Sequence, residues 1–311
     1  MLGRFAVLVL LFSLFIASTC EREVKLDLDD LNDKLVIYSA FSAGDTLRLQ
    51  LGKSKKVINR DPAEFLPGAE VNLYEDDIFL EKLDFIVPGG NNRTPPYYKS
   101  QTDDVIKVGK TYRIEAILDG FETVEAKSTI PYPVTIRFFD FFELQIDSES
   151  EPGFITYSYY VNAKINDPQS QENYYHLIAY QEIWAEELVN GTLVSNPYYV
   201  PLRFDDASNT NDVVSYDKQG VLLKDNPFED GYRFDLENFR IRSSNVTIGR
   251  VIIELRTVSK AYYLFHTSIS QQQGATDLLF TEPVFIYENI SNGHGIFAGY
   301  STQFGAIELQ E

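Results

Sequence analysis

Residues 109–131 read GKTYRIEAILDGFETVEAKSTIP and are the clearest signature of the fold. Apolar and polar side chains alternate on both sides of the dipeptide Asp119-Gly120, which is the pattern of two half-buried β-strands. Asp-Gly between such strands favours a two-residue type I′ turn, because both central residues of that turn take a positive φ. The stretch therefore predicts an antiparallel hairpin with strands at 111–118 and 121–130.

The hairpin follows several other short strand patterns. Alternating apolar runs at 34–42, 46–51 and 69–74 precede it, separated by turns that contain Gly or Pro. About seven short strands over ~100 residues is typical of a β-sandwich, so we predict one at 34–131. Residues 68–76 (GAEVNLYED) and the hairpin together resemble the small immunoglobulin- and transthyretin-like modules related to carboxypeptidase-regulatory domains.

A stiff link ends this unit, and a larger domain follows it. Residues 130–133 (IPYP) hold two prolines two residues apart, which favour an extended backbone. We therefore predict a second, antiparallel β-rich domain at 134–311, which makes the whole chain mostly β. Its strands are expected at 134–142, 153–165, 173–182, 234–241 and 247–258.

Two local signals stand out in the second domain. Ser259 is a good N-cap residue and Gly274 a helix stop, and apolar residues between them recur at helical spacing. We therefore predict one helix at about 259–273, packed on the sheet. Asn190-Gly191 between two apolar runs predicts a second type I′ hairpin.

The N-terminal segment predicts where the protein resides. Arg4 precedes an apolar run at 5–16, three small residues and Cys20. The run is too short to span a membrane, which takes ~20 apolar residues, and suits the ~7–15-residue core of a signal peptide. We interpret 1–19 as a lipoprotein signal peptide and Cys20 as the residue that receives diacylglycerol and an acyl chain. The alternative is an ordinary secretory signal with a chance cysteine.

Residues 20–33 are acidic and lack a sizeable apolar face, so we predict a tether between the lipid and the first domain. An acidic stretch behind a lipidated cysteine resembles the surface-export signal of Bacteroidetes lipoproteins, although a plain solvated linker explains the composition equally well. Cys20 is the only cysteine, so its acylation excludes disulfides and cysteine-based metal or catalytic sites.

The charge balance argues against two classes of partner. The net charge is −19, and it becomes −20 without 1–19, because that segment holds one basic residue, Arg4, and no acidic residue. Nucleic acid and anionic membranes both attract proteins through Lys and Arg. We therefore expect no nucleic acid, and membrane attachment through the lipid alone, at ~0.8 kcal/mol per buried CH2 group.

Four stretches together indicate a family. They are DLDDLNDKLVIYSAF at 27–41, NYYHL at 173–177, SKAYYLF at 259–265 before a Gln-rich helix end, and EPVFIYENISNGHGIFAGY at 282–300. With the lipoprotein start, they resemble the Bacteroidetes outer-membrane lipoproteins grouped as domain of unknown function 4249. The resemblance covers nearly the whole mature chain. It implies an accessory protein found beside TonB-dependent outer-membrane transporters, and it implies no catalytic residue.

Three residues are the best candidates for contact with a ligand or partner. Tyr198 and Tyr199 form one of five Tyr-Tyr pairs and lie between two prolines, so we expect a loop there. Exposed tyrosines favour protein interfaces and stack on sugars. His294 lies in a glycine-rich turn, which we interpret as a structural chain reversal, with an anion-binding loop as the alternative. Ordinary packing or a plain surface position is the competing interpretation for each.

The polar loop at 205–212 is the candidate metal site. Asp205, Asp206, Asn209 and Asp212 offer the hard oxygen ligands that suit Ca2+, but the loop lacks the spacing and the closing Glu of an EF-hand. We otherwise expect no cofactor beyond the lipid on Cys20.

Three functional hypotheses follow. The first is a non-catalytic outer-membrane lipoprotein, exposed at the cell surface, that serves as an accessory or binding subunit of a TonB-dependent β-barrel nutrient transporter, with an unidentified small-molecule or glycan ligand. The second is a structural or adhesive surface lipoprotein. The third is a carbohydrate-active hydrolase, which needs two carboxylates ~5–10 Å apart, a spacing that the sequence does not reveal.

Overall fold

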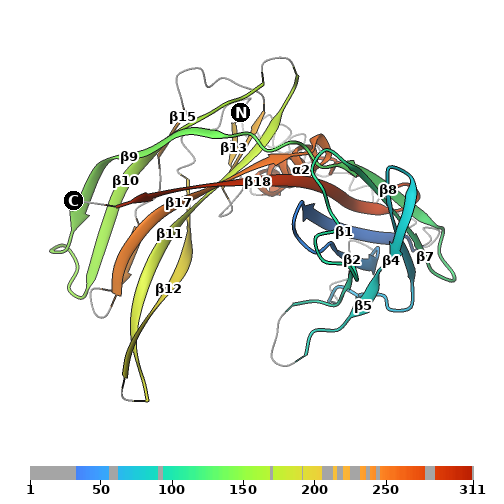
Figure 1. Ribbon diagram of the computed structural model, residues 1–311, viewed down its shortest axis with the longest axis horizontal. Coiled ribbons are helices and arrows are strands. Elements are labelled where there is room, and N and C mark those ends of the chain that lie inside the picture. Colours follow the sequence, from blue (N-terminus) through green and yellow to red (C-terminus); the bar gives the residue numbers. More distant parts are fainter. Residues whose placement is uncertain are drawn as a thin grey trace, which may run out of the picture. The chain divides into compact units, whose positions relative to one another are not determined.

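The computed structural model describes residues 33–55, 62–89, 94–168, 171–190, 192–204, 213–215, 220–224, 232–235, 239–242, 246–276 and 284–309 (Figure 1). Within these ranges the chain forms three β-sheets and a single helix. The prediction of a mostly β, sandwich-like fold with one helix is confirmed.

A ten-stranded sheet carries the fold. In spatial order its strands are β13 (Val213–Ser215), β14 (Val221–Lys224), β11 (Tyr174–Val189), β17 (Val246–Val258), β18 (His294–Glu308), β1 (Leu35–Ser42), β2 (Arg48–Lys53), β6 (Tyr97–Lys99) and β5 (Asp84–Ile86), and β12 (Thr192–Leu202) pairs with β11. β18 pairs with β1 in parallel and with β17 antiparallel (Figure 1). Strands from both sides of the boundary expected at 131–134 thus belong to one sheet, and the division into 34–131 and 134–311 stays a prediction.

Two smaller sheets each contain four strands. One has the order β4 (Ile78–Lys82), β3 (Glu70–Glu75), β7 (Thr111–Ile117) and β8 (Val124–Thr129). In the other, β10 (Phe154–Ile165) pairs along one edge with β9 (Ile136–Asp147) and along the other with β15 (Tyr232–Asp235) and β16 (Phe239–Arg242). Both small sheets are antiparallel throughout their described pairings.

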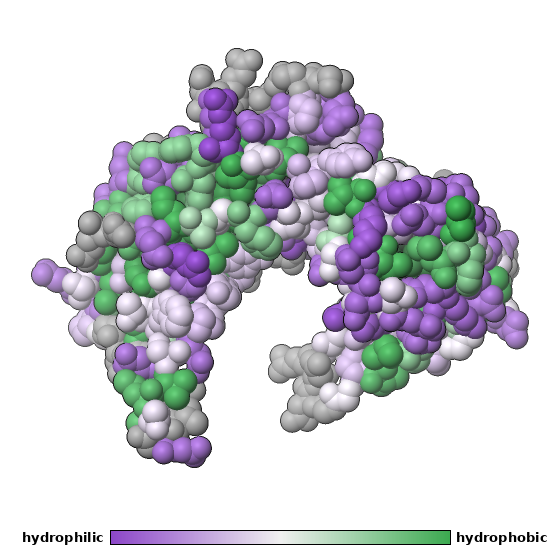
Figure 2. Space-filling model, viewed as in Figure 1, coloured by the Kyte–Doolittle hydropathy of each residue, from purple (hydrophilic) through white to green (hydrophobic). Residues whose placement is uncertain are grey.

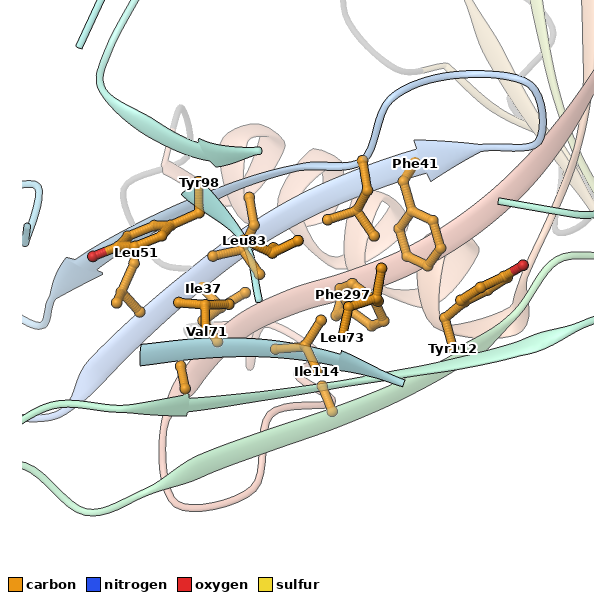
Figure 3. Close-up of a cluster of buried hydrophobic side chains, with 14 of the residues drawn as sticks. Ile37, Phe41, Leu51, Val71, Leu73, Leu83, Tyr98, Tyr112, Ile114 and Phe297 are labelled. Carbon is orange, nitrogen blue, oxygen red and sulfur yellow. The ribbon is translucent and has the colours of Figure 1, made fainter. Parts of the chain in front are cut away.

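The same face of β18 contributes to two hydrophobic cores. The first core joins β1 and β18 to β3 and β7, and Figure 3 shows Ile37 of β1 facing Val71 of β3, with Phe41 farther along β1 near Tyr112. The ring of Phe41 stacks on Phe297 of β18 at 4.4 Å between centroids. Ile307 packs against the second core, which has residues of β10 on one side and residues of β11 and β17 on the other. Phe297 and Ile307 are an even number of residues apart, so they point to one face of the strand.

The helix packs on the opposite face. Helix α2 (Lys260–Thr276) contributes Tyr262, Tyr263 and Phe265 to a third core, which includes Ile296 and Ala298 of β18. The predicted start is confirmed, because the Ser259 Oγ accepts a hydrogen bond from the Tyr262 N–H at 3.3 Å. The predicted end at 273 is wrong. The helix runs through Gly274, since one glycine costs a helix only ~0.5–1 kcal/mol.

The two hairpin predictions are confirmed for the strands and only in part for the turns. β7 and β8 pair antiparallel, but β7 ends at Ile117 and β8 begins at Val124, so the connection is longer than two residues. Only Gly120 of the dipeptide has a positive φ (+87°), and the Phe121 N–H donates to the Leu118 carbonyl, which is a type II turn. Asn190 has φ +52° between the paired strands β11 and β12, as a type I′ turn requires; Gly191 lies outside the described residues.

Two glycines of the stretch 282–300 lie where atoms of a neighbouring strand approach the backbone. Gly295 has φ +103°, and a Cβ there would overlap the Ile37 carbonyl of the parallel partner strand. A Cβ on Gly293 would lie 2.7 Å from the Leu35 oxygen. The Asn289 side chain accepts from the Phe297 N–H and donates to the Phe297 carbonyl, at 2.9 and 2.8 Å. The stretch thus brings β18 against β1, as the structural interpretation of the glycines requires.

Gly295→Ala is expected to lower the free energy of unfolding by about 2–4 kcal/mol, because it combines backbone strain with overlap on the paired strand. Gly120→Ala is the matched control. Gly120 also has a positive φ, but no atom lies within 4 Å of its Cβ position, so the expected loss is only about 1 kcal/mol. Urea unfolding of both variants measures the difference. Equal losses would contradict the close approach of β18 to β1.

Candidate functional site

Exposed apolar side chains gather on edge strand β4. Asp76 and Asp77 connect β3 to β4, and both have a positive φ (48° and 66°), which makes a type I′ turn. The next three residues are Ile78, Phe79 and Leu80, and all three are exposed, Ile78 by 70%. β4 pairs with β3 alone among the described strands, so its other edge is free. This segment, residues 78–80, is called the β4 edge below.

Charged neighbours hold the turn before the β4 edge. Asp76 accepts hydrogen bonds from the Lys110 Nζ at 2.7 Å and from a backbone N–H of β7 at 3.2 Å. Asp77 pairs with Lys127 at 2.8 Å and Arg113 at 3.3 Å. The bond from Lys110 lowers the pKa of Asp76, and the bond from Lys127 lowers that of Asp77. Arg113 also lies over the Tyr74 ring, 3.7 Å from its centroid, so the side chains behind the β4 edge are fixed.

The second exposed apolar surface is the β11–β12 hairpin. Its two strands pair from Ala179↔Leu202 to the turn, whereas the described pairing of β11 with β17 ends at Ala185↔Val246. Residues 186–190 and 192–195 therefore form a two-stranded end beyond the described pairing with β17. Leu188 and Leu193 are direct cross-strand partners there and are exposed by 73% and 61%. Figure 2 shows hydrophobic atoms gathered near the end of this hairpin.

Tyr198 and Tyr199 lie on the stem of the hairpin. The expected loop is wrong, because both belong to β12, an edge strand that tolerates the flanking prolines. They point to opposite faces of the strand, opposite Ile183 and Glu182, and each is about half-exposed. The structure thus places both tyrosines in a regular strand.

A buried carboxylate, paired with a partly exposed arginine, lies at the base of the hairpin. Glu182 lies at a bulge, where it alone faces Gly249 and Arg250 of β17. Its carboxylate accepts from the Arg250 side chain at 2.7 and 3.1 Å and from the Arg250 backbone N–H at 3.1 Å. These bonds lower the pKa of Glu182 to about 2. A Cβ on Gly249 would lie 2.5 Å from the carboxylate, so the glycine makes room for it.

A polar cluster lies between α2 and the large sheet. The Tyr262 hydroxyl bonds the His176 Nδ1 at 2.9 Å and accepts from Arg256 at 3.4 Å. Arg256 also pairs with Glu254, at 2.5 Å, and Tyr180 donates to the same carboxylate at 3.0 Å. The groups therefore satisfy one another, and the arrangement joins the helix to β11 and β17.

His266 of α2 borders this polar cluster. Its ring lies 4.2 Å from the Tyr262 ring, between centroids. Burial, and next the positive charge of Arg256, lower the pKa of His266 to about 4. The imidazole is therefore neutral near pH 7, and it packs as an uncharged aromatic ring.

One half-open pocket of about 370 Å3 lies beside this cluster. It is lined by Ala40, Phe41, Ser42, Asp45, Thr46, Arg48 and Tyr300. Asp45 accepts from the Ser42 hydroxyl at 2.5 Å, and the Arg48 guanidinium lies 5.2 Å from the Tyr97 ring centroid. One acid, one base and several hydroxyls could hold a small polar molecule there.

His294 is separate from the two tyrosines. It is the first residue of β18 and pairs with Val36. The hairpin lies beside the other end of β18, where Glu308 pairs with Arg250. The His294 Nδ1 lies 2.9 Å from a carboxylate oxygen of Glu288 at the surface. The structure therefore does not bring the three candidate contact residues into one site.

Several predicted sites lie outside the described residues. They are the lipidation site Cys20, with the segments 1–19 and 20–32, and the metal candidates Asp205, Asp206, Asn209 and Asp212. Within the described ranges, no group of three or more His, Cys, Asp and Glu side chains is arranged to hold a metal ion. No helix in those ranges combines the length and hydropathy of a membrane span.

The sequence agrees with one protein family. A family model described as a domain of unknown function, DUF4249, matches residues 21–304. The chain belongs to the DUF4249 family. No curated protein and no solved structure matches it. The DUF4249 match spans strands β1 to β17, helix α2 and most of β18, so the family corresponds to the whole described fold.

The sequence interpretation missed both exposed surfaces of this DUF4249 protein. A signal for the β4 edge is present, because three consecutive apolar residues follow Asp76-Asp77 where alternation would allow one or two. Apolar residues flank Asn190-Gly191 on both sides, but the sequence does not tell that neighbouring strands stop short of Leu188 and Leu193.

The pKa of His266 makes stability depend on pH. The folded pKa, about 4, is below the ordinary 6.5, so the unfolded chain binds the proton more readily. Stability from this residue is complete above pH 6.5 and is lost as the pH falls toward 4. Urea unfolding between about pH 5 and 6.5, above the range of ordinary carboxylates, is expected to give a smaller pH slope in His266→Gln than in the wild type. Identical slopes would contradict a buried, neutral His266.

Proposed function

We propose that this DUF4249 protein is a non-catalytic, lipid-anchored protein of a Bacteroidetes outer membrane. In this proposal it acts as an accessory subunit of a TonB-dependent β-barrel nutrient transporter. The observation that carries the proposal is the β4 edge, where Ile78, Phe79 and Leu80 are exposed on a free edge strand. A structural or adhesive lipoprotein is the alternative.

The β4 edge suits a protein partner. A free strand edge with apolar side chains promotes association with other chains unless something covers it. The turn before it is held by ion pairs to Lys110, Lys127 and Arg113, so the partner would meet a pre-ordered surface. The net charge of −19 further favours a partner that presents a basic surface, because complementary charge accelerates encounter.

The N-terminal segment supports attachment at a membrane. An apolar run ends in small residues and Cys20, the only cysteine of the chain. Thirteen residue steps separate Cys20 from Asp33, the first described residue. An extended chain spans at most ~3.3–3.6 Å per residue, so this tether reaches up to ~45 Å. That reach allows the folded part to contact a barrel embedded in the same membrane.

Cys20→Ser is expected to release the protein from the membrane, because acyl chains would supply the anchor. Fractionation of cells that produce the wild type or the variant measures the distribution, and mass spectrometry of the N-terminal peptide reads the lipid directly. A variant that still sediments with the outer membrane and carries acyl chains would contradict lipidation at Cys20.

The pair Ile78→Asp and Leu80→Asp is expected to reduce recovery of a β-barrel transporter about tenfold or more, because charge would replace apolar contact in a buried interface. The measurement is mild detergent purification of a C-terminally tagged copy from native outer membrane, followed by quantitative mass spectrometry. Val87→Asp is the matched control, since Val87 is exposed by 67% but lies outside the β4 edge.

Thermal unfolding of each purified variant checks that the fold is intact. If equal amounts of transporter are recovered with the double variant and with the control, the β4 edge is not the surface that binds the transporter. A wild-type protein recovered alone in several mild detergents would contradict the accessory role and favour the adhesive alternative.

A further inference from the structure

Among the described residues, the end of the β11–β12 hairpin is a two-stranded ribbon without a third strand, and it carries apolar side chains at its extremity. Leu188 and Leu193 oppose each other directly and are the most exposed apolar side chains described on these two strands. The described partners of β11 on the sheet side end at Ala185. The described residues of the ribbon end therefore present two adjacent apolar side chains, and the residues 188–190 with 192–193 are called the hairpin tip.

Two aromatic side chains lie four and five residues farther from the end of the hairpin than the two leucines. Trp184 is four residues before Leu188, which is about 13 Å along a strand at ~3.3 Å per residue. Tyr198 is five residues beyond Leu193 on the paired strand, and both aromatic side chains are partly exposed. The two leucines lie at the end of the hairpin, and Trp184 and Tyr198 lie farther from the end. This order matches a membrane surface, where apolar side chains enter the acyl layer and aromatic rings prefer the headgroup level.

The charge of the hairpin indicates which kind of lipid surface it can enter. The sequence from 165 to 202 contains no Lys or Arg, and Glu182, Glu186 and Glu187 lie on β11. An anionic headgroup would be repelled, whereas a zwitterionic headgroup carries no net charge to oppose insertion. A protein partner would need an apolar socket for the two adjacent leucines.

We propose that the hairpin tip inserts shallowly into a zwitterionic lipid surface, with Leu188 and Leu193 at the acyl boundary and Trp184 among the headgroups. This proposal deepens the proposed function, because it rests on membrane attachment, and it adds a second contact that orients the folded part. Two leucines bind a bilayer weakly by themselves. The tether raises their effective concentration at the surface, so the contact forms without further affinity.

Trp184 is the only tryptophan of the chain, so its fluorescence reports on the hairpin alone. The chain from residue 21, which retains every described residue, carries a hexahistidine tag in place of the lipidated cysteine. The tag holds the protein on phosphatidylcholine vesicles that contain a nickel-chelating lipid. Emission is recorded with ordinary phosphatidylcholine and with phosphatidylcholine that carries a nitroxide on its headgroup, which quenches only indoles that approach the headgroup layer.

The wild type is expected to show a shift of Trp184 emission to shorter wavelength and a loss of emission on vesicles with nitroxide-labelled headgroups. The double variant Leu188→Asp, Leu193→Asp is expected to lose both effects. Leu188→Ser, Leu193→Ser serves as a second, milder variant, and an unchanged emission spectrum without vesicles checks the fold of each. Phe304→Asp is the matched control, because Phe304 is exposed by 67% on β18 and not at the hairpin tip; it is expected to behave as the wild type.

Unchanged emission of the wild type on vesicles, or equal quenching in the double variant, would overturn the proposal. Shielding of Trp184 in native membranes but not on protein-free vesicles would also overturn it and would assign the tip to a protein. The vesicles hold neither an acylated cysteine nor a transporter. A failure of the accessory role or of Cys20 lipidation therefore leaves this result standing, and a failure here leaves those proposals intact.

Discussion

The parallel pairing of β1 with β18 is the contact on which the rest of the structure depends. Seven residue pairs, from Val36↔His294 to Ser42↔Tyr300, join the two strands. β18 supplies Phe297 to the first core, Ile307 to the edge of the second, and Ile296 to the third under α2. A strand that serves three cores cannot slip by one residue without moving each side chain to the wrong face. The fixed register places residue 295 where the Ile37 carbonyl approaches the backbone, and a glycine there leaves room for that carbonyl.

The two exposed surfaces share a design. Each presents apolar side chains on strands that lack a described neighbour on one side, and each has a base held by ion pairs. Ion pairs of Asp76 and Asp77 hold the turn before the β4 edge, and the buried carboxylate of Glu182 binds the side chain and the backbone N–H of Arg250 at the base of the hairpin. Loss of Arg250 would leave the buried Glu182 carboxylate without its cation, so this pairing holds β11 and β17 together at the base. Bases held in this way reduce the entropy lost when an apolar surface becomes covered.

Local patterns in the sequence predicted the local structure well. Alternation found β7 and β8, and Ser259 marked the start of α2, because strand alternation and N-caps depend on neighbouring residues. Turn type failed at Asp119-Gly120, where both strands end early. Tyr198 and Tyr199 lie in a strand because an edge accepts the prolines that suggested a loop. The parallel β1–β18 ladder joins segments far apart in sequence, and no periodicity within either one encodes its partner.

The domain boundary shows the same limit. The prolines at 131 and 133 predicted a boundary from local composition alone, whereas β1 and β18, which lie on either side of it in the sequence, pair in one sheet. The most direct test is hydrogen exchange followed by mass spectrometry at increasing denaturant. If the pairing unites the described fold, peptides from β1 (35–42) and β17 (246–258) become exchangeable in one cooperative step with one midpoint. Two separate steps, with β1 released while β17 stays protected, would contradict this account.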